Sequence, residues 1–184
     1  MSITKKIDAI TSIPDNVKTT TPIPPRSVKI ELTGRCNYRC SFCALRSRGV
    51  QPTKDMDFSL FKKITREMKS VGVEEIGVFY LGESFTTPKF LVNAVKFLKE
   101  EVQMPYVFLT TNGSLATPEI VRELMEAKLD SLKWSVNAAD REQFYDVMQV
   151  KPDLFDKSLD NLKMAKEITR RKLNQRNVTT SSLF

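Results

Sequence analysis

The sequence predicts an α/β fold in which helices cover the outer face of a parallel sheet. Short strand-like segments alternate four times with segments whose apolar residues recur at helical spacing. A single helix separates each strand from the next, and this connection favours parallel pairing through a right-handed crossover. With 184 residues, of which 41% are hydrophobic, the chain is long enough for one domain rather than two.

Four strands are predicted in chain order. Apolar and polar residues alternate over residues 28–33, which is the period of a half-buried strand. β-Branched and aromatic residues predict further strands over residues 76–80, 106–111 and 132–136. The pair Asn112-Gly113 predicts a turn directly after the third of these strands.

Each predicted strand is followed by a predicted helix. Two of these helices have the same start signal, Thr87-Pro88 and Thr117-Pro118, in which threonine is a cap and proline takes the first helical position. The apolar residues of the four helices are Phe58, Phe61, Ile64 and Met68; Leu91, Ala94, Val95, Leu98 and Val102; Ile120, Val121, Leu124 and Ala127; and Phe155, Leu159, Leu162 and Ile168.

The two ends of the chain lie outside this regular pattern. Residues 1–26 contain Thr-Thr-Thr-Pro-Ile-Pro-Pro and little periodic apolar content, so we expect an extended arm before a domain over residues 27–184. Residues 177–184 are a candidate start of a fifth strand.

The composition excludes several kinds of chemistry. The chain contains no histidine, which excludes Ser-His-Asp and Cys-His catalysis and histidine-containing zinc sites. Its three cysteines are an odd number, so they cannot form a complete disulfide framework. No apolar run has the length of a membrane helix, and the first residues lack the apolar stretch of a secretion signal. We therefore expect a cytoplasmic protein.

The formal charge of +7 favours acidic partners, nucleic acid among them. The basic residues are scattered, however, and only Arg170, Arg171, Lys172 and Arg176 form a run. A run of this kind is typical of a solvated helix end. The charge pattern gives nucleic acid binding little support.

All three cysteines lie in one short loop after the first strand. Cys36, Cys40 and Cys43 have the spacing Cys-x3-Cys-x2-Cys, which places three thiolates together. Three thiolates can bind three irons of a cubane cluster and leave the fourth iron open for an exogenous ligand. The alternatives are three buried cysteines or a zinc site, although zinc commonly takes four ligands in paired Cys-x2-Cys motifs.

The cysteine loop, with Phe42 just before its last cysteine, resembles the signature of the radical S-adenosylmethionine (radical SAM) superfamily. Leu81-Gly82-Glu83-Ser84 resembles that family's Gly-Gly-Glu-Pro motif, although two of the four positions differ. Residues 110–113 and 135–137 also resemble the family pattern. Each of these motifs closes a successive predicted strand.

This resemblance implies a partial TIM-type barrel of six strand-helix units, truncated here after about four. It also implies a [4Fe-4S] cluster on Cys36, Cys40 and Cys43, with S-adenosyl-L-methionine chelating the open iron. Reductive cleavage would give methionine and a 5′-deoxyadenosyl radical that abstracts hydrogen from a substrate, a peptide or a small metabolite. A flavodoxin or a ferredoxin would be the one-electron donor.

Three residues near the cluster receive roles in binding the cofactor. Phe42 offers a flat apolar surface against which adenine can pack. Gly82 has no side chain and lets the backbone come close to the methionine moiety. Glu83 is an acceptor for the methionine ammonium, with a salt bridge to a nearby basic residue as the alternative.

The later motifs supply four more candidates. In the fourth strand, Ser135 and Asn137 are expected on the polar face with Lys133, toward the cofactor, whereas Val136 is expected on the outer face. Strand-end capping or a turn is the alternative role for Ser135 and Asn137. Thr110 and Asn112 are candidates for the substrate side. No catalytic residue is predicted.

Two broader questions remain open at the level of sequence. The alternative function is a non-catalytic iron-sulfur or zinc module that binds nucleic acid through a basic surface.

Four units do not close a six-unit barrel, so we expect either a longer natural chain, which we favour, or a partner that completes the barrel. We also expect residues 1–184 alone to be aggregation-prone or only marginally stable, with feeble or absent activity.

Overall fold

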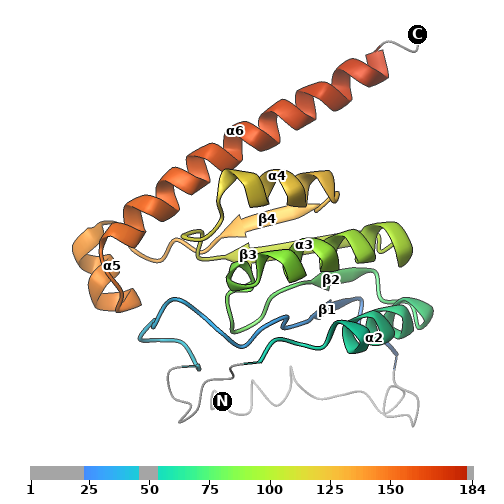
Figure 1. The fold of residues 1–184 in the computed structure, drawn as a ribbon, viewed down its shortest axis with the longest axis horizontal. Helices are drawn as coiled ribbons and strands as arrows, with labels where there is room; N and C mark the ends of the chain where they lie inside the picture. Colours follow the sequence, from blue (N-terminus) through green and yellow to red (C-terminus); the bar gives the residue numbers. More distant parts are fainter. Residues whose placement is uncertain (1–22, 46–53, 182–184) are drawn as a thin grey trace, which may run out of the picture.

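The computed structural model describes residues 23–45 and 54–181, with side chains described up to residue 170. Figure 1 shows the chain alternating between strands and helices before it ends in one long helix. In chain order the elements are β1 (Ser27–Lys29), α2 (Phe58–Ser70), β2 (Glu75–Gly77), the 3-10 helix η2 (Ser84–Thr86), α3 (Pro88–Lys96), the π-helical turn η3 (Phe97–Glu101), β3 (Tyr106–Thr111), α4 (Pro118–Glu126), β4 (Ser131–Trp134), α5 (Arg141–Met148) and α6 (Asp153–Ser181).

The described strands form one parallel sheet in the order β1-β2-β3-β4, which confirms the predicted fold class. Each strand pairs with the next strand of the chain, so every crossover advances in the same direction. Right-handed crossovers that advance in one direction place all their helices on one face. The helices α2, α3 and α4 lie in this way, as in the wall of a barrel (Figure 1).

The hydrophobic core lies between the sheet and these helices. Val107 and Leu109 of β3 are fully buried and belong to one cluster with Phe61 of α2, Leu91 of α3 and Leu124 of α4. Burying one such side chain contributes roughly 1.5–3 kcal/mol. The core therefore holds the sheet in place, and the carboxyl ends of the strands are held with it.

The two faces of β4 follow the predicted alternation only as far as the strand extends. Leu132 and Trp134 pack against the core, while Lys133 is exposed on the opposite face. The strand ends at Trp134, and Val136, two residues beyond it, is 46% exposed and therefore less covered than Leu132 and Trp134. Ser135 still donates its main-chain N–H to the carbonyl oxygen of Thr111 at 2.8 Å.

The first strand is shorter than predicted because the main chain after it forms hydrogen bonds to a segment outside the sheet. β1 comprises Ser27–Lys29, and the N–H of Ile30 continues the pairing by donating to the oxygen of Gly77 at 2.7 Å. The carbonyl oxygen of Leu32 then accepts from the N–H of Met56 at 2.8 Å instead. This exchange directs the chain out of the sheet and into the cysteine loop.

The helices α3 and α4 begin at the predicted residues, although their caps differ from the prediction. Thr87 and Thr117 occupy the cap positions and a proline follows each, yet neither threonine side chain makes a capping hydrogen bond. Asp57, by contrast, caps α2 by accepting from the N–H of Leu60 at 2.8 Å. Proline, whose backbone angle is already helical, therefore accounts for the start of α3 and α4.

Helix α5 was not predicted. Asp140 caps its first turn by accepting from the N–H of Gln143 at 2.8 Å, and Gln149 ends the helix with a φ of 53°. Phe144 and Met148 are buried in a second apolar cluster with Tyr38 of the cysteine loop. Helix α5 therefore covers one side of the cysteine loop.

Helix α6 confirms the fourth predicted helix and overturns the expected fifth strand. Residues 177–181 are helical, and residues 182–184 lie outside the described residues. Most of the expected arm over residues 1–26 also lies outside them. The end of α6, which carries the basic run, projects beyond the sheet (Figure 1). Within the described parts of the chain, no helix has the length and apolarity needed to cross a membrane.

Candidate cofactor site at the carboxyl ends of the strands

The predicted motifs meet at the carboxyl ends of the four strands. The cysteine loop follows β1, the segment 81–84 follows β2, the segment 112–114 follows β3, and residues 135–137 follow β4. In parallel α/β sheets this edge carries the ligand sites, because the loops there surround a common space.

Glu83 is the buried centre of this edge, with only 4% of its surface exposed. Its Oε1 accepts from the hydroxyl of Thr111 at 2.9 Å and from the N–H of Phe85 at 3.1 Å. Its Oε2 accepts from the N–H of Asn112 at 2.8 Å. Burial raises the pKa of this carboxyl above its usual value, and the three hydrogen bonds oppose that rise.

This arrangement leaves Glu83 with spare acceptor capacity. A carboxylate offers about four acceptor positions, of which the described donors use three. Among the described side chains, no basic residue pairs with Glu83, so the alternative salt bridge receives no support. The carboxylate is thus held rigidly and can accept one further donor.

Gly82 lies in close contact with the base of the cysteine loop. A Cβ atom at this position would lie 2.0 Å from the carbonyl oxygen of Thr33 and 3.0 Å from that of Arg35. The next N–H, that of Glu83, donates to the same Arg35 oxygen at 2.8 Å. Gly82 therefore brings the segment after β2 against the cysteine loop, a role that the sequence did not reveal.

Glu31 is a positioning residue that sequence reasoning missed. Its Oε1 accepts from two successive N–H groups, those of Leu81 at 2.9 Å and Gly82 at 2.8 Å. A carboxylate near the end of the first strand was the available signal, but alternation alone did not distinguish it from a solvated side chain.

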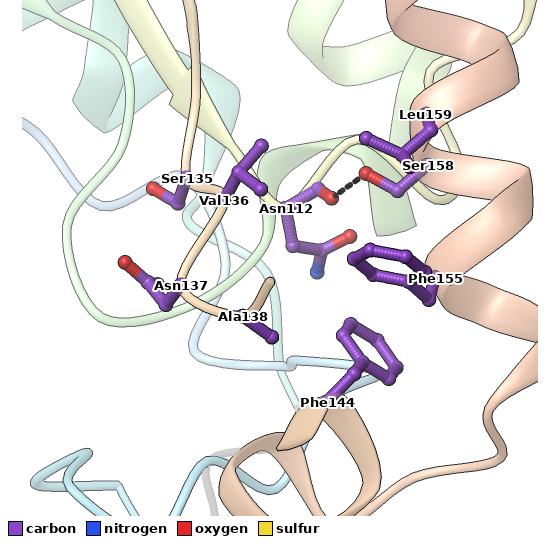
Figure 2. A pocket seen from close by; sticks show the side chains of 9 residues that line it. All are labelled: Asn112, Ser135, Val136, Asn137, Ala138, Phe144, Phe155, Ser158 and Leu159. Atoms are coloured by element: carbon purple, nitrogen blue, oxygen red, sulfur yellow. Dashed lines mark hydrogen bonds between the residues drawn. The ribbon is translucent and has the colours of Figure 1, made fainter. Parts of the chain in front are cut away.

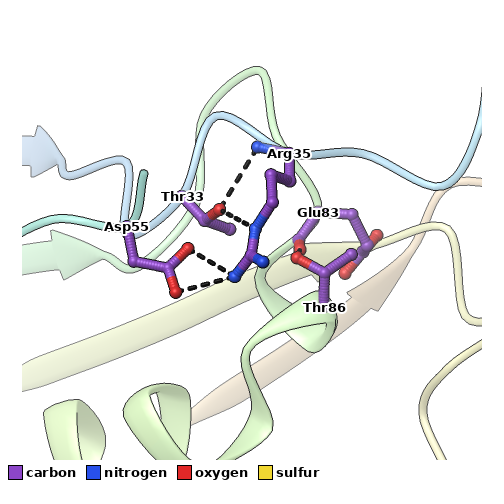
Figure 3. Close-up of polar contacts among 5 residues, drawn as sticks. All are labelled: Thr33, Arg35, Asp55, Glu83 and Thr86. Carbon is purple, nitrogen blue, oxygen red and sulfur yellow. Dashed lines mark hydrogen bonds and ion pairs between the residues drawn. The ribbon is translucent and has the colours of Figure 1, made fainter. Parts of the chain in front are cut away.

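An ion pair fixes the start of the cysteine loop. Figure 3 shows the guanidinium of Arg35 between Asp55 and Thr33. Its Nη2 lies 2.6 and 2.7 Å from the two oxygens of Asp55, and its Nε donates to the Thr33 hydroxyl at 3.3 Å. The pair is partly exposed, so it contributes about 1 kcal/mol or less to stability. Its main effect is to orient the loop.

The cysteine loop is held against the end of α5. The N–H of Arg39 donates to the oxygen of Met148 at 3.1 Å, and the N–H of Ser41 donates to the oxygen of Val147 at 2.8 Å. The Sγ of Cys40 lies 3.3 Å from the Sδ of Met148. Sequence reasoning missed this contact because it did not predict α5.

All three thiols are free and partly exposed. Burial raises the pKa of Cys36 to about 11 and also raises that of Cys40, so both are protonated in this structure at neutral pH. Binding iron as thiolates would release these protons.

The cysteine loop offers a donor set that an iron-sulfur cluster could use. Within residues 23–45 and 54–170, no three histidine, cysteine or acidic side chains are grouped closely enough to hold one ion. A cubane does not require this convergence, because each thiolate binds a different iron. The donor set, three free thiols on one partly exposed loop, fits that arrangement.

The other predicted residues are placed around this centre. Phe42 is 64% exposed on the cysteine loop. Thr110 is half-buried on the sheet face opposite the core, whereas its neighbour Thr111 bonds Glu83. Figure 2 shows Asn112, Ser135 and Asn137 around one small pocket.

This pocket lies between the end of β4 and the helices α5 and α6. It opens to solvent, and the space within it has room for little more than one water molecule. The rings of Phe144 and Phe155, 5.5 Å apart, form one wall. In this structure the pocket is therefore too small to enclose a ligand such as S-adenosylmethionine.

We expect Gly82→Ala to disrupt the site. The added methyl group would contact main-chain oxygens, which cannot rotate away, so the segment after β2 must shift. The expected loss is about 1–3 kcal/mol in the free energy of unfolding, together with loss of cofactor binding. Gly72→Ala is the control: Gly72 has a φ of 98° but open space around it, so it should lower stability and leave binding intact. Equal cofactor affinity in both variants would contradict this prediction.

The fold and site define an α/β protein of the partial-barrel class with a cysteine loop and a buried carboxylate at one edge. The chain belongs to the radical SAM superfamily, whose family model matches residues 30–180. Among curated proteins, it is 28% identical over 163 residues to the S-adenosylmethionine-dependent nucleotide dehydratase RSAD2 of Siniperca chuatsi, covering 86% of this chain and 40% of that protein. It is 30% identical over 145 residues to the GTP 3′,8-cyclase of Chlorobaculum tepidum, covering 77% and 42%.

Solved structures show the same fold. anSMEcpe with bound AdoMet matches with a TM-score of 0.64 and 18% identity, over 79% of this chain and 42% of that one. Streptococcus suis SuiB bound to S-adenosylmethionine matches with a TM-score of 0.64 and 22% identity, over 80% and 32%. The chain spans about two fifths of the length of the two curated relatives named above.

Proposed function

We propose that this chain is the core of an enzyme that binds a [4Fe-4S] cluster and S-adenosylmethionine. Cys36, Cys40 and Cys43 would hold the cluster. When bound, a reduced cluster supplies one electron that breaks the bond between sulfur and the 5′-carbon, giving methionine and a 5′-deoxyadenosyl radical that takes hydrogen from a substrate. The observation that carries the proposal is the cysteine loop packed beside a buried, rigid carboxylate with one free acceptor position.

The residues of the site have distinct tasks in this function. Glu83 accepts a hydrogen bond from the methionine ammonium, and its burial strengthens that charge-assisted bond. Gly82 brings this carboxylate close to the cluster loop, and its main chain, without a side chain, would also come close to the methionine moiety. Phe42, exposed beside the last cysteine, packs against adenine.

Ser135 and Asn137 bind the ribose or the carboxylate of the cofactor from the pocket beyond β4. Thr110 and Asn112 remain candidates for the substrate side. The partly exposed thiols leave the cluster loop accessible to a one-electron donor such as a flavodoxin or a ferredoxin.

A peptide or a small metabolite is the proposed substrate class. One structural neighbour, anSMEcpe, was solved with a peptide, and another neighbour is a methylornithine synthase. The family match favours an enzyme over a non-catalytic module that binds nucleic acid. A cytoplasmic location remains part of the proposal.

The test is anaerobic reconstitution with iron and sulfide, followed by absorbance spectra with and without S-adenosylmethionine. We expect cluster absorbance that changes when the cofactor is added, and 5′-deoxyadenosine after reduction with dithionite. A cluster whose absorbance spectrum stays unchanged when S-adenosylmethionine is added would contradict the proposal and favour the non-catalytic module.

A further inference from the structure

Asn37, which directly follows Cys36, joins two side chains from a distant part of the chain. Its Nδ2 donates to the hydroxyl of Ser114 at 2.8 Å, and its Oδ1 accepts from the Nδ2 of Asn112 at 2.9 Å. The Ser114 hydroxyl in turn donates to the Oδ1 of Asn112 at 2.8 Å. The three side chains therefore close a ring of hydrogen bonds, called the amide ring below.

Each member of the amide ring donates one hydrogen bond to the next member, so the bonds run in one consistent direction. Ser114 is fully buried, and Asn37 and Asn112 are half-buried, so water competes little with these bonds. Hydrogen bonds in such a network reinforce one another, and removing one member leaves its buried partners unpaired.

The amide ring is anchored on three sides. The main-chain N–H of Asn112 donates to Oε2 of Glu83 at 2.8 Å. From α6, the hydroxyl of Ser158 donates to the carbonyl oxygen of Asn112 at 2.6 Å, and Nδ2 of Asn161 donates to that of Gly113 at 2.8 Å. The segment after β3 is thus a fixed frame that also holds the buried carboxylate.

Asn37 is not needed for the turn itself. The Oδ1 of Asn112 already accepts from the main-chain N–H of Ser114 at 3.0 Å, which closes the turn locally. Asn37 belongs to the cysteine loop, and its side chain adds two hydrogen bonds between that loop and the segment after β3. Its contribution therefore concerns how the cysteine loop lies relative to Glu83.

We propose that Asn37 is a positioning residue that fixes the cysteine loop relative to Glu83, so that cluster and cofactor meet in one geometry. This inference rests on the proposed function. It gives the residue after the first cysteine a task distinct from binding iron.

The test compares Asn37→Ala with wild type in cluster-loaded protein. We expect wild-type iron and sulfide content, about tenfold weaker affinity for S-adenosylmethionine by calorimetry, and a smaller cofactor-induced change in the electron paramagnetic resonance spectrum of the reduced cluster. In cluster-free protein, hydrogen exchange should become faster at the amides of Asn112 and Arg39, because both lie in the joined segments.

Two further variants sharpen the test. Asn93→Ala changes an exposed asparagine on α3 and should match wild type in every measurement. Ser114→Ala should weaken cofactor affinity, and its combination with Asn37→Ala should be no worse than the more severe single variant if the ring acts as a unit.

Unchanged cofactor affinity and unchanged exchange in Asn37→Ala would overturn the inference. Loss of the cluster in that variant would overturn it as well, since Asn37 would then serve cluster retention. Wild-type protein that binds a cluster and no cofactor would instead refute the proposed function, and the exchange rates would still decide whether Asn37 holds the loop.

Discussion

Replacing any one of Cys36, Cys40 and Cys43 with alanine is expected to abolish the cluster. The three thiols lie on one loop, and the chain offers no histidine or fourth cysteine that could replace a lost ligand. Two thiolates would leave two irons of a cubane without protein ligands. Iron and sulfide content after anaerobic reconstitution measures the effect, which should be a near-complete loss in each variant.

The matched control for the cysteine variants is Ser41→Ala. Ser41 is exposed on the same loop, and its main-chain N–H bond to the oxygen of Val147 survives the change. This variant should keep wild-type cluster content and thermal stability. If all three cysteine variants also kept wild-type iron and sulfide, the ligand assignment would be wrong.

Removing the Glu83 carboxylate is expected to affect both stability and cofactor binding. Glu83→Ala deprives the N–H groups of Phe85 and Asn112 and the hydroxyl of Thr111 of their shared acceptor. Each buried group left unpaired costs about 1–3 kcal/mol, so the free energy of unfolding should fall by about 3 kcal/mol or more. In the alanine variant alone, weaker cofactor binding could therefore not be separated from a loss of folded protein.

Glu83→Gln separates the two effects. Its remaining oxygen can still accept from Phe85 and Thr111, while its amide group faces the N–H of Asn112, so the expected destabilisation is about 1–3 kcal/mol. The lost charge removes a charge-assisted bond to the methionine ammonium, which predicts roughly 10- to 100-fold weaker cofactor affinity by calorimetry.

Cluster content should stay at the wild-type level in Glu83→Gln, because no cysteine is changed. Glu100→Gln, an exposed carboxylate in η3, is the control for the loss of charge and should bind the cofactor normally. Wild-type affinity in a folded Glu83→Gln variant would remove this residue from the cofactor site.

The sequence determined the parts of this protein that depend on local periodicity and on residue chemistry. Alternating apolar residues predicted the first strand, and β-branched and aromatic residues predicted the other three. Helical spacing predicted α2, α3, α4 and α6, and proline fixed the starts of α3 and α4. The strand-helix order then implied the parallel sheet, since single-helix crossovers favour that pairing. The cysteine spacing predicted the ligand set, because three thiolates in one loop need no tertiary information to lie near one another.

Only the tertiary structure decided which residues hold these parts together. Helix α5 is eight residues long, and its buried Phe144 and Met148 pack against partners from distant parts of the chain, Tyr38 of the cysteine loop among them. The roles of Glu31 and Asn37 depend on hydrogen bonds to segments about 50 and 75 residues away in the chain. Periodicity reports which way a side chain faces within its own element, and it carries no information about which distant amide that side chain will meet.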